Sequence, residues 1–165
     1  MSNQNEEAKK NELHKKMKFV HAWMAAQKKE LKELPFVTDC NYMTASPGEY
    51  VIADPCYVLS DEYWMAHIML IPDKVIEKGC TVSFEGVEFL LSSTVYGDNF
   101  YDVEGADGFA VDSGLFAIMP RAMVGDKYNP DLMATLKLED QVISIGKGCL
   151  KVNHEKIVDT DWLKQ

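Results

Sequence analysis

The sequence lacks the local patterns that mark most common activities. It has no phosphate-binding glycine loop, no H-E-x-x-H and no G-x-S-x-G. No two of its four cysteines have C-x-x-C spacing, which disfavours a zinc site or a redox switch. No apolar run approaches the roughly 20 residues of a membrane span, and residues 1–12 carry no apolar signal core. We therefore expect no cofactor, no metal, no membrane partner and a cytoplasmic location.

Positive charge is scarce outside the N-terminal region. The 165 residues carry a net charge of −9, and Arg121 is the only arginine. Residues 1–34 hold eight Lys against five Glu, a balance of +3, whereas residues 35–165 hold nine Lys and Arg against 21 Asp and Glu, a balance of −12. Affinity for nucleic acid comes largely from neutralised phosphates, so an acidic body excludes it as a direct partner.

Residues 6–34 contain no Gly or Pro and are rich in good helix formers, which predicts a long amphipathic helix ended by Pro35. Its apolar side chains follow a heptad seam over about three repeats. Two interpretations stay open: the helix packs on its own domain, or it mediates self-association or docking. The interface predicted for the second case comprises Leu13, Met17, Val20, Trp23, Met24 and Leu31.

The rest of the chain predicts a β-rich domain. Short alternating segments are separated by turn signals such as Glu85-Gly86, Glu139-Asp140, Gly146-Lys147-Gly148 and Asn153-His154. Ser60 has the sequence context of an N-cap for one short internal helix that stops before Pro72. We expect an α+β fold: the long N-terminal helix in residues 1–34, and in residues 35–165 a mainly antiparallel β-sandwich or open barrel.

Three segments carry a resemblance. They are Tyr50–Leu59 followed by Asp61–Trp64, then Tyr96–Tyr101, then Val111–Gly114. In this order they resemble small bacteriophage-type proteins whose segments read GDPCYVxxDxxW, GDGxY and VDSG. Ala53 stands where that pattern usually has Gly, and Asn99 where its second Gly falls. The match covers about residues 50–120. It implies a phage or accessory protein, located in the host cytoplasm if phage-encoded, and it carries over no catalytic residue.

The candidate ligand-binding residues cluster in these segments. Clustered aspartates next to glycines can bind a cation through oxygen ligands, but they also cap turns, and their spacing does not match an EF-hand. A cysteine can be a nucleophile or a buried thiol, and the lone Arg121 can bind a phosphate or form an internal salt bridge to Asp98 or Asp112. The predicted site comprises Asp54, Cys56, Tyr57, Asp98, Tyr101, Asp112 and Arg121, with no residue assigned as catalytic.

Two functional hypotheses follow. In the first, the chain is a non-enzymatic phage-type accessory or interaction protein, whose acidic body binds a protein partner while the N-terminal helix mediates docking or oligomerisation. In the second, it is a small enzyme or ligand-binding module for a nucleotide-like or sugar-like compound. The second hypothesis requires Asp54, Asp98 and Asp112 to converge. The sequence does not decide whether the protein is an enzyme.

Overall fold

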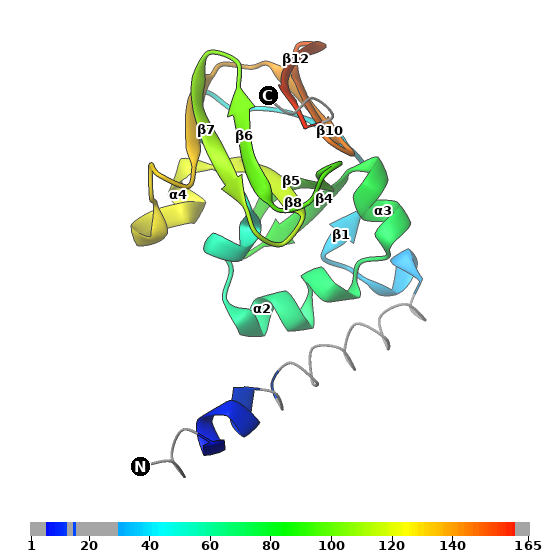
Figure 1. Cartoon of the computed structure of the whole chain (residues 1–165). Coiled ribbons are helices and arrows are strands. Elements are labelled where there is room, and N and C mark those ends of the chain that lie inside the picture. Colours follow the sequence, from blue (N-terminus) through cyan, green and yellow to red (C-terminus); the bar gives the residue numbers. More distant parts are fainter. Residues whose placement is uncertain (1–5, 13–14, 16–29, 161–165) are drawn as a thin grey trace.

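The computed structural model describes residues 6–12, 15 and 30–160. This part of the chain is mostly β, with strands paired antiparallel in three sheets and only short helices (Figure 1). The six-stranded sheet has the order β1 (Val37–Thr38), β4 (Cys80–Phe84), β5 (Val87–Ser93), β8 (Leu115–Pro120), β3 (Gly48–Ala53) and β9 (Ala134–Leu138).

A four-stranded sheet and a two-stranded hairpin complete the β structure. The four-stranded sheet has the order β12 (Glu155–Asp159), β11 (Cys149–Val152), β10 (Val142–Gly146) and β2 (Tyr42–Thr44). The hairpin pairs β6 (Asn99–Val103) with β7 (Ala106–Val111). It bridges the two larger sheets, because Ala110 N–H donates to Leu132 O beside β9 at 3.0 Å and Glu104 N–H donates to Ile157 O of β12 at 2.8 Å.

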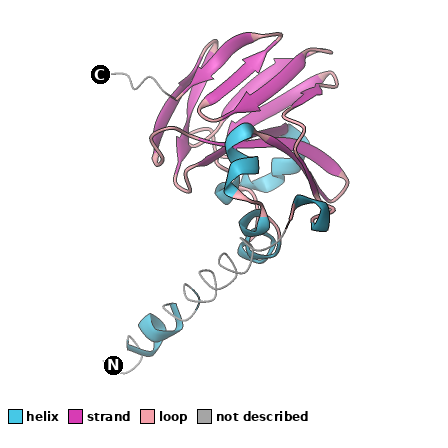
Figure 2. Cartoon of the chain, turned by 90° about the vertical axis from the view of Figure 1, so that its right-hand side faces the viewer, coloured by secondary structure: helices cyan, strands magenta, loops and turns pink. Residues whose placement is uncertain are grey.

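The helices of residues 30–160 are short and gather on one side of the strands (Figure 2). They are η1 (Leu31–Glu33), η2 (Pro55–Tyr57), α2 (Asp61–Ala66), η3 (Ile68–Leu70), α3 (Asp73–Lys78), α4 (Arg121–Val124) and η4 (Gly125–Lys127). Ser60 caps α2, as predicted, by accepting a hydrogen bond from Tyr63 N–H at 3.1 Å. The prediction of one internal helix is wrong, since α3 begins directly after Pro72.

The central strands of the six-stranded sheet are buried on both faces. In β3, Val51 and Ala53 join the core beneath the helices, whereas Tyr50 and Ile52 join the core shared with the second sheet and the hairpin. This follows from the period-two alternation of a strand. It also explains why Tyr50–Ala53 is continuously apolar, because each of its two faces needs its own hydrophobic partners.

The predicted fold class is wrong. The helix described at the N-terminus covers seven residues, 6–12, and Glu30 has extended backbone angles (φ −89°, ψ 153°), so no helix runs on to Pro35. Leu31 packs against the core of the body and Leu34 is buried in it, while Pro35 disfavours helical geometry at Leu34. These tertiary contacts override the helix propensity of the segment. The seam residues Leu13, Met17, Val20, Trp23 and Met24 lie outside the described residues.

The predicted turns are confirmed. The turns at Glu85-Gly86, Gly146-Lys147-Gly148 and Asn153-His154 close hairpins, since β4 pairs with β5, β10 with β11 and β11 with β12. The turn at Glu139-Asp140 instead leads from β9 of the six-stranded sheet to β10 of the four-stranded sheet. Both residues of the first turn have positive φ, 49° at Glu85 and 80° at Gly86, as a type I′ hairpin turn requires. Each of these elements is specified by residues close together in the sequence.

Candidate functional site

Asp54 directly follows strand β3 and is completely buried. Its Oδ1 accepts hydrogen bonds from Cys56 N–H at 2.8 Å and from the Ser113 hydroxyl at 2.7 Å. Its Oδ2 accepts from Asp112 N–H at 2.7 Å and from Ser113 N–H at 2.6 Å. Four donors therefore surround the carboxyl group, the arrangement expected around an ionised carboxylate.

These bonds give Asp54 a structural task. It caps η2, whose first residue Pro55 has no N–H and so needs no acceptor, and it joins η2 to the turn between β7 and β8. The same turn contains Gly114 at φ +79°, a backbone conformation that favours glycine. The Asp54-Pro55 and Asp112-Ser113-Gly114 segments are thus two halves of one hydrogen-bonded unit, here called the Asp54 clamp.

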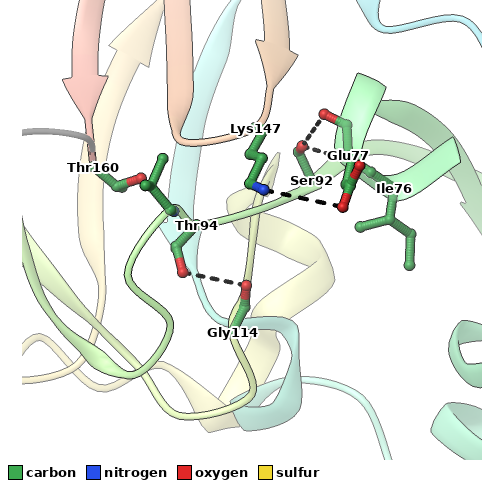
Figure 3. Close-up of polar contacts among 8 residues, drawn as sticks. Ile76, Glu77, Ser92, Thr94, Gly114, Lys147 and Thr160 are labelled. Carbon is green, nitrogen blue, oxygen red and sulfur yellow. Dashed lines mark hydrogen bonds and ion pairs between the residues drawn. The ribbon is translucent and has the colours of Figure 1, made fainter. Parts of the chain in front are cut away.

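A second set of bonds holds the neighbouring loop against this clamp. The Thr94 side chain donates to Gly97 O at 3.0 Å and to Gly114 O at 3.3 Å, the second of which Figure 3 shows. Thr94 N–H also donates to Gly114 O at 2.9 Å. Tyr101 donates its hydroxyl to Gly97 O at 2.7 Å. The loop that carries Asp98 is in this way fastened to the turn that carries Asp112.

The thiol of Cys56 lies in this acidic setting. Burial raises its pKa far above the usual range for a thiol, and the negative charges of Asp54, Asp112 and Asp98 raise it further. No hydrogen bond joins Cys56 to His67 or His154, the two histidines that the structure describes; His67 instead stacks on Tyr63 at 4.0 Å between ring centroids. A nucleophilic cysteine needs a lowered pKa, so the site disfavours thiolate chemistry.

A shallow pocket of about 250 Å³ opens beside the clamp. It is lined by Cys56, Leu59, Asp61, Trp64, Asp112 and Ser113. Asp61 starts helix α2 directly after the Ser60 cap, and Trp64 lies one turn further along the same helix. The pocket therefore combines two exposed carboxyl groups with an indole ring, a combination that suits a cationic group.

The remaining predicted site residues divide into two groups. Asp98 and Tyr57 lie near the pocket: the pKa of Tyr57 is raised by partial burial and then by the charges around it, which include Asp112 and Asp98. Tyr101 belongs to the core and is only 3% exposed. Arg121 lies over the Tyr128 ring, with its guanidinium carbon 4.2 Å from the ring centroid, and donates to Gly125 O at 3.3 Å.

The interpretation of Arg121 as an ion-pair partner of Asp98 or Asp112 is wrong, because no such pair occurs among the described residues. Within residues 6–12, 15 and 30–160, no group of three or more His, Cys, Asp or Glu side chains is arranged to hold a metal ion. Sequence reasoning missed Ser113 as a partner of Asp54, and Leu59 and Asp61 as pocket walls. The N-cap at Ser60 was the one signal that placed Asp61 and Trp64 on a defined helix.

No family model matches the sequence, and neither a curated protein nor a solved structure is significantly similar to it. Among the helices that the structure describes, none has the length and apolar character needed to cross a membrane.

Proposed function

We propose that this chain is a non-enzymatic interaction protein of phage type, whose acidic β-rich body binds a protein partner. The observation that carries the proposal is the Asp54 clamp: the Asp54 carboxyl group accepts four hydrogen bonds and is completely buried. A carboxylate occupied in this way has no free lone pair facing a substrate, so it serves folding and not acid–base chemistry.

The surface beside the clamp supports a binding role. Asp61 and Asp112 line the pocket with Trp64, and the exposed rings of Tyr96 and Phe100 flank Asp98 in the sequence. Exposed aromatic residues are enriched at protein interfaces, and an acidic surface speeds association with a basic partner. The partner expected here presents Lys or Arg side chains, one of which enters the pocket and stacks on Trp64.

The lysine-rich N-terminal segment contributes docking or self-association in this proposal. Light scattering on the full chain and on a variant that begins at Glu30 tests this part. That variant keeps Leu31, which packs on the core, and Leu34, which is buried in it. Loss of self-association or partner binding in the shorter chain supports a role for the segment, and unchanged behaviour of both chains contradicts it. The proposed location is the cytoplasm, that of the host if the chain is phage-encoded.

The alternative of a small-ligand module has less support. The pocket of about 250 Å³ is smaller than the roughly 300–1,000 Å³ typical of ligand sites. Asp98 and Asp112 do lie near one another around Cys56, but the third carboxyl group, Asp54, is enclosed. A nucleotide-like compound would meet two exposed carboxyl groups there, which repel its phosphate.

The test compares two charge variants of the full chain in affinity capture quantified by mass spectrometry. The first combines Asp61→Asn, Asp98→Asn and Asp112→Asn around the pocket. The control combines Asp126→Asn, Asp131→Asn and Asp140→Asn, three exposed carboxyl groups that do not line it. We expect the partner to be lost with the first variant and kept with the control.

Equal capture by both variants would contradict this binding surface. A thermal-shift screen with nucleotides, sugars and divalent cations runs in parallel, because a ligand that binds only the native state raises the melting temperature. Stabilisation by one of these compounds that disappears in the first variant would favour the small-ligand alternative instead.

A further inference from the structure

Strand β2 is an edge strand with unused backbone groups. Its only sheet neighbour among the described residues is β10, with Met43 opposite Ile143 and Thr44 opposite Val142. The N–H and C=O of Val142 are both taken by Asn153 on the β11 side, at 2.9 and 2.8 Å. Because both backbone groups of Val142 face β11, Val142 makes no backbone hydrogen bond to Thr44, the residue opposite it in β2. In an antiparallel pair the N–H and C=O of Thr44 then point away from β10, outward from the edge of the sheet.

A groove runs beside this edge. It has a volume of about 460 Å³ and lies between Met43 and Thr44 of β2 and the β4–β5 hairpin, which contributes Ser83, Gly86, Val87 and Glu88. Glu88 is exposed, and neither Lys nor Arg is among the described residues that line the groove. The groove thus offers the backbone N–H and C=O of Thr44 along one side and the negative charge of Glu88 along the other.

The edge is held in place at both ends. Before β2, the Thr81 hydroxyl donates to Cys40 O at 2.6 Å and the Asn41 side chain donates to Lys78 O at 3.2 Å. After β2, Ala45 N–H donates to Gln141 O at 2.8 Å, and the Tyr50 hydroxyl donates to Ser46 O at 2.9 Å. A strand fixed in its extended form needs no ordering when a partner binds, which favours affinity.

We propose that β2 accepts an extended segment of a partner protein as an added strand, with a basic side chain of that segment next to Glu88. Backbone groups at an open edge are recognised by another backbone, and alternate side chains of the added strand supply specificity. The exposed ring of Tyr42, on the same face of β2 as Thr44 and 60% accessible, gives that segment an aromatic contact.

The charge of the chain favours a basic partner segment over a second copy of the chain as the strand added to β2. Residues 35–165 carry a balance of −12, so pairing two copies edge to edge brings two acidic bodies together. Like charges disfavour that contact, whereas a basic segment is attracted. The inference deepens the proposed interaction function and rests on it, but it uses a surface built from residues other than those around the Asp54 clamp.

The test screens a display library of random nine-residue peptides against the full chain and against two variants at one position. Thr44→Pro removes the outward N–H but no bond to β10, whereas the control Thr44→Ala keeps the N–H. We expect the screen to select peptides whose affinity for Thr44→Pro is at least about tenfold lower than for the unmodified chain. Their affinity for Thr44→Ala should be within about twofold of that for the unmodified chain. Glu88→Lys should weaken those peptides that contain Lys or Arg.

Hydrogen exchange of the Thr44 amide in the unmodified chain gives a second readout that does not depend on the proline variant folding. Peptide binding should slow this exchange. The proposal is overturned if no selected peptide distinguishes Thr44→Pro from Thr44→Ala and none protects the amide. It is also overturned if Thr44 mediates a dimer that Thr44→Pro abolishes, since the occupant is then a second copy. The same peptides are also tested on the variant that combines Asp61→Asn, Asp98→Asn and Asp112→Asn. Peptide binding that is unchanged in this variant shows that the β2 edge binds independently of the acidic surface around the pocket.

Discussion

Asp54 shows how one side chain can organise residues that are distant in sequence. It comes directly after the buried strand β3, and two of its donors, Asp112 N–H and Ser113 N–H, lie 58 and 59 positions further along the chain. A buried carboxylate is costly unless its oxygens are satisfied, and here each oxygen accepts two hydrogen bonds. The cost of burying the charge is therefore offset only when both segments are in place.

Asp54→Asn should destabilise the protein strongly. The amide group turns its own donors toward N–H groups that now lack an acceptor, so we expect a loss on the order of 3–5 kcal/mol in the free energy of unfolding, measured by urea denaturation. The control Ser113→Ala removes a single donor and should cost about 1 kcal/mol. If Asp54→Asn costs no more than this control, the clamp is not a major source of stability.

At the scale of elements, the contact between the β10–β11 turn and the loop after β5 depends on Gly148. Its N–H donates to Ser93 O at 2.7 Å, and its C=O accepts from Thr160 N–H at 2.6 Å. The Thr160 hydroxyl in turn accepts from Val95 N–H at 3.1 Å. A Cβ at position 148 would collide with the side chains of Val95 and Thr160, and φ is +71°. The second sheet is thus fastened to the segment that leads into the Asp98 loop.

Gly148→Ala should therefore cost about 3 kcal/mol, because an overpacked contact adds to the strain of a positive φ. Gly86→Ala is the matched control: its φ is +80°, but an added Cβ would meet nothing within 4 Å, so only the backbone strain of about 1 kcal/mol remains. Thermal melts of the two variants measure the difference. Equal losses would show that the close packing around Gly148 relaxes freely.

The elements that the sequence predicts correctly are those whose signals are local. The β4–β5 hairpin follows from Glu85-Gly86 between alternating apolar residues, and helix α2 follows from Ser60. The prediction of a long N-terminal helix is wrong at Glu30, which is extended, because Leu34 is buried against residues that are distant in the sequence. The site follows the same rule: the aspartates are recognisable in sequence, but the enclosure of Asp54 depends on donors far along the chain.

Across the whole molecule, the two cores share one central sheet, and one of them contains a thiol. Cys80 starts β4 and is completely buried in the core beneath the helices. Burial raises the pKa of its thiol from an ordinary value of 9.0 to about 12. Tyr63 packs against the same core, and burial followed by the charge of Glu85 raises the pKa of its hydroxyl from 10.0 to about 12. Both groups keep their protons in the folded state at pH values where the unfolded chain releases them.

The protein should consequently lose stability in alkali. For Cys80 the contribution is fully present below pH 9, the unfolded pKa, and it is lost as pH rises toward the folded pKa of about 12. Between pH 8 and pH 10 the free energy of unfolding should fall by about 1 kcal/mol from this thiol, because the unfolded state binds fewer protons. Tyr63 adds to the loss only above pH 10. Urea denaturation of the chain and of Cys80→Ala at both pH values measures the effect: the variant starts from lower stability but should lose less of it, and an unchanged slope would mean that Cys80 does not titrate on unfolding.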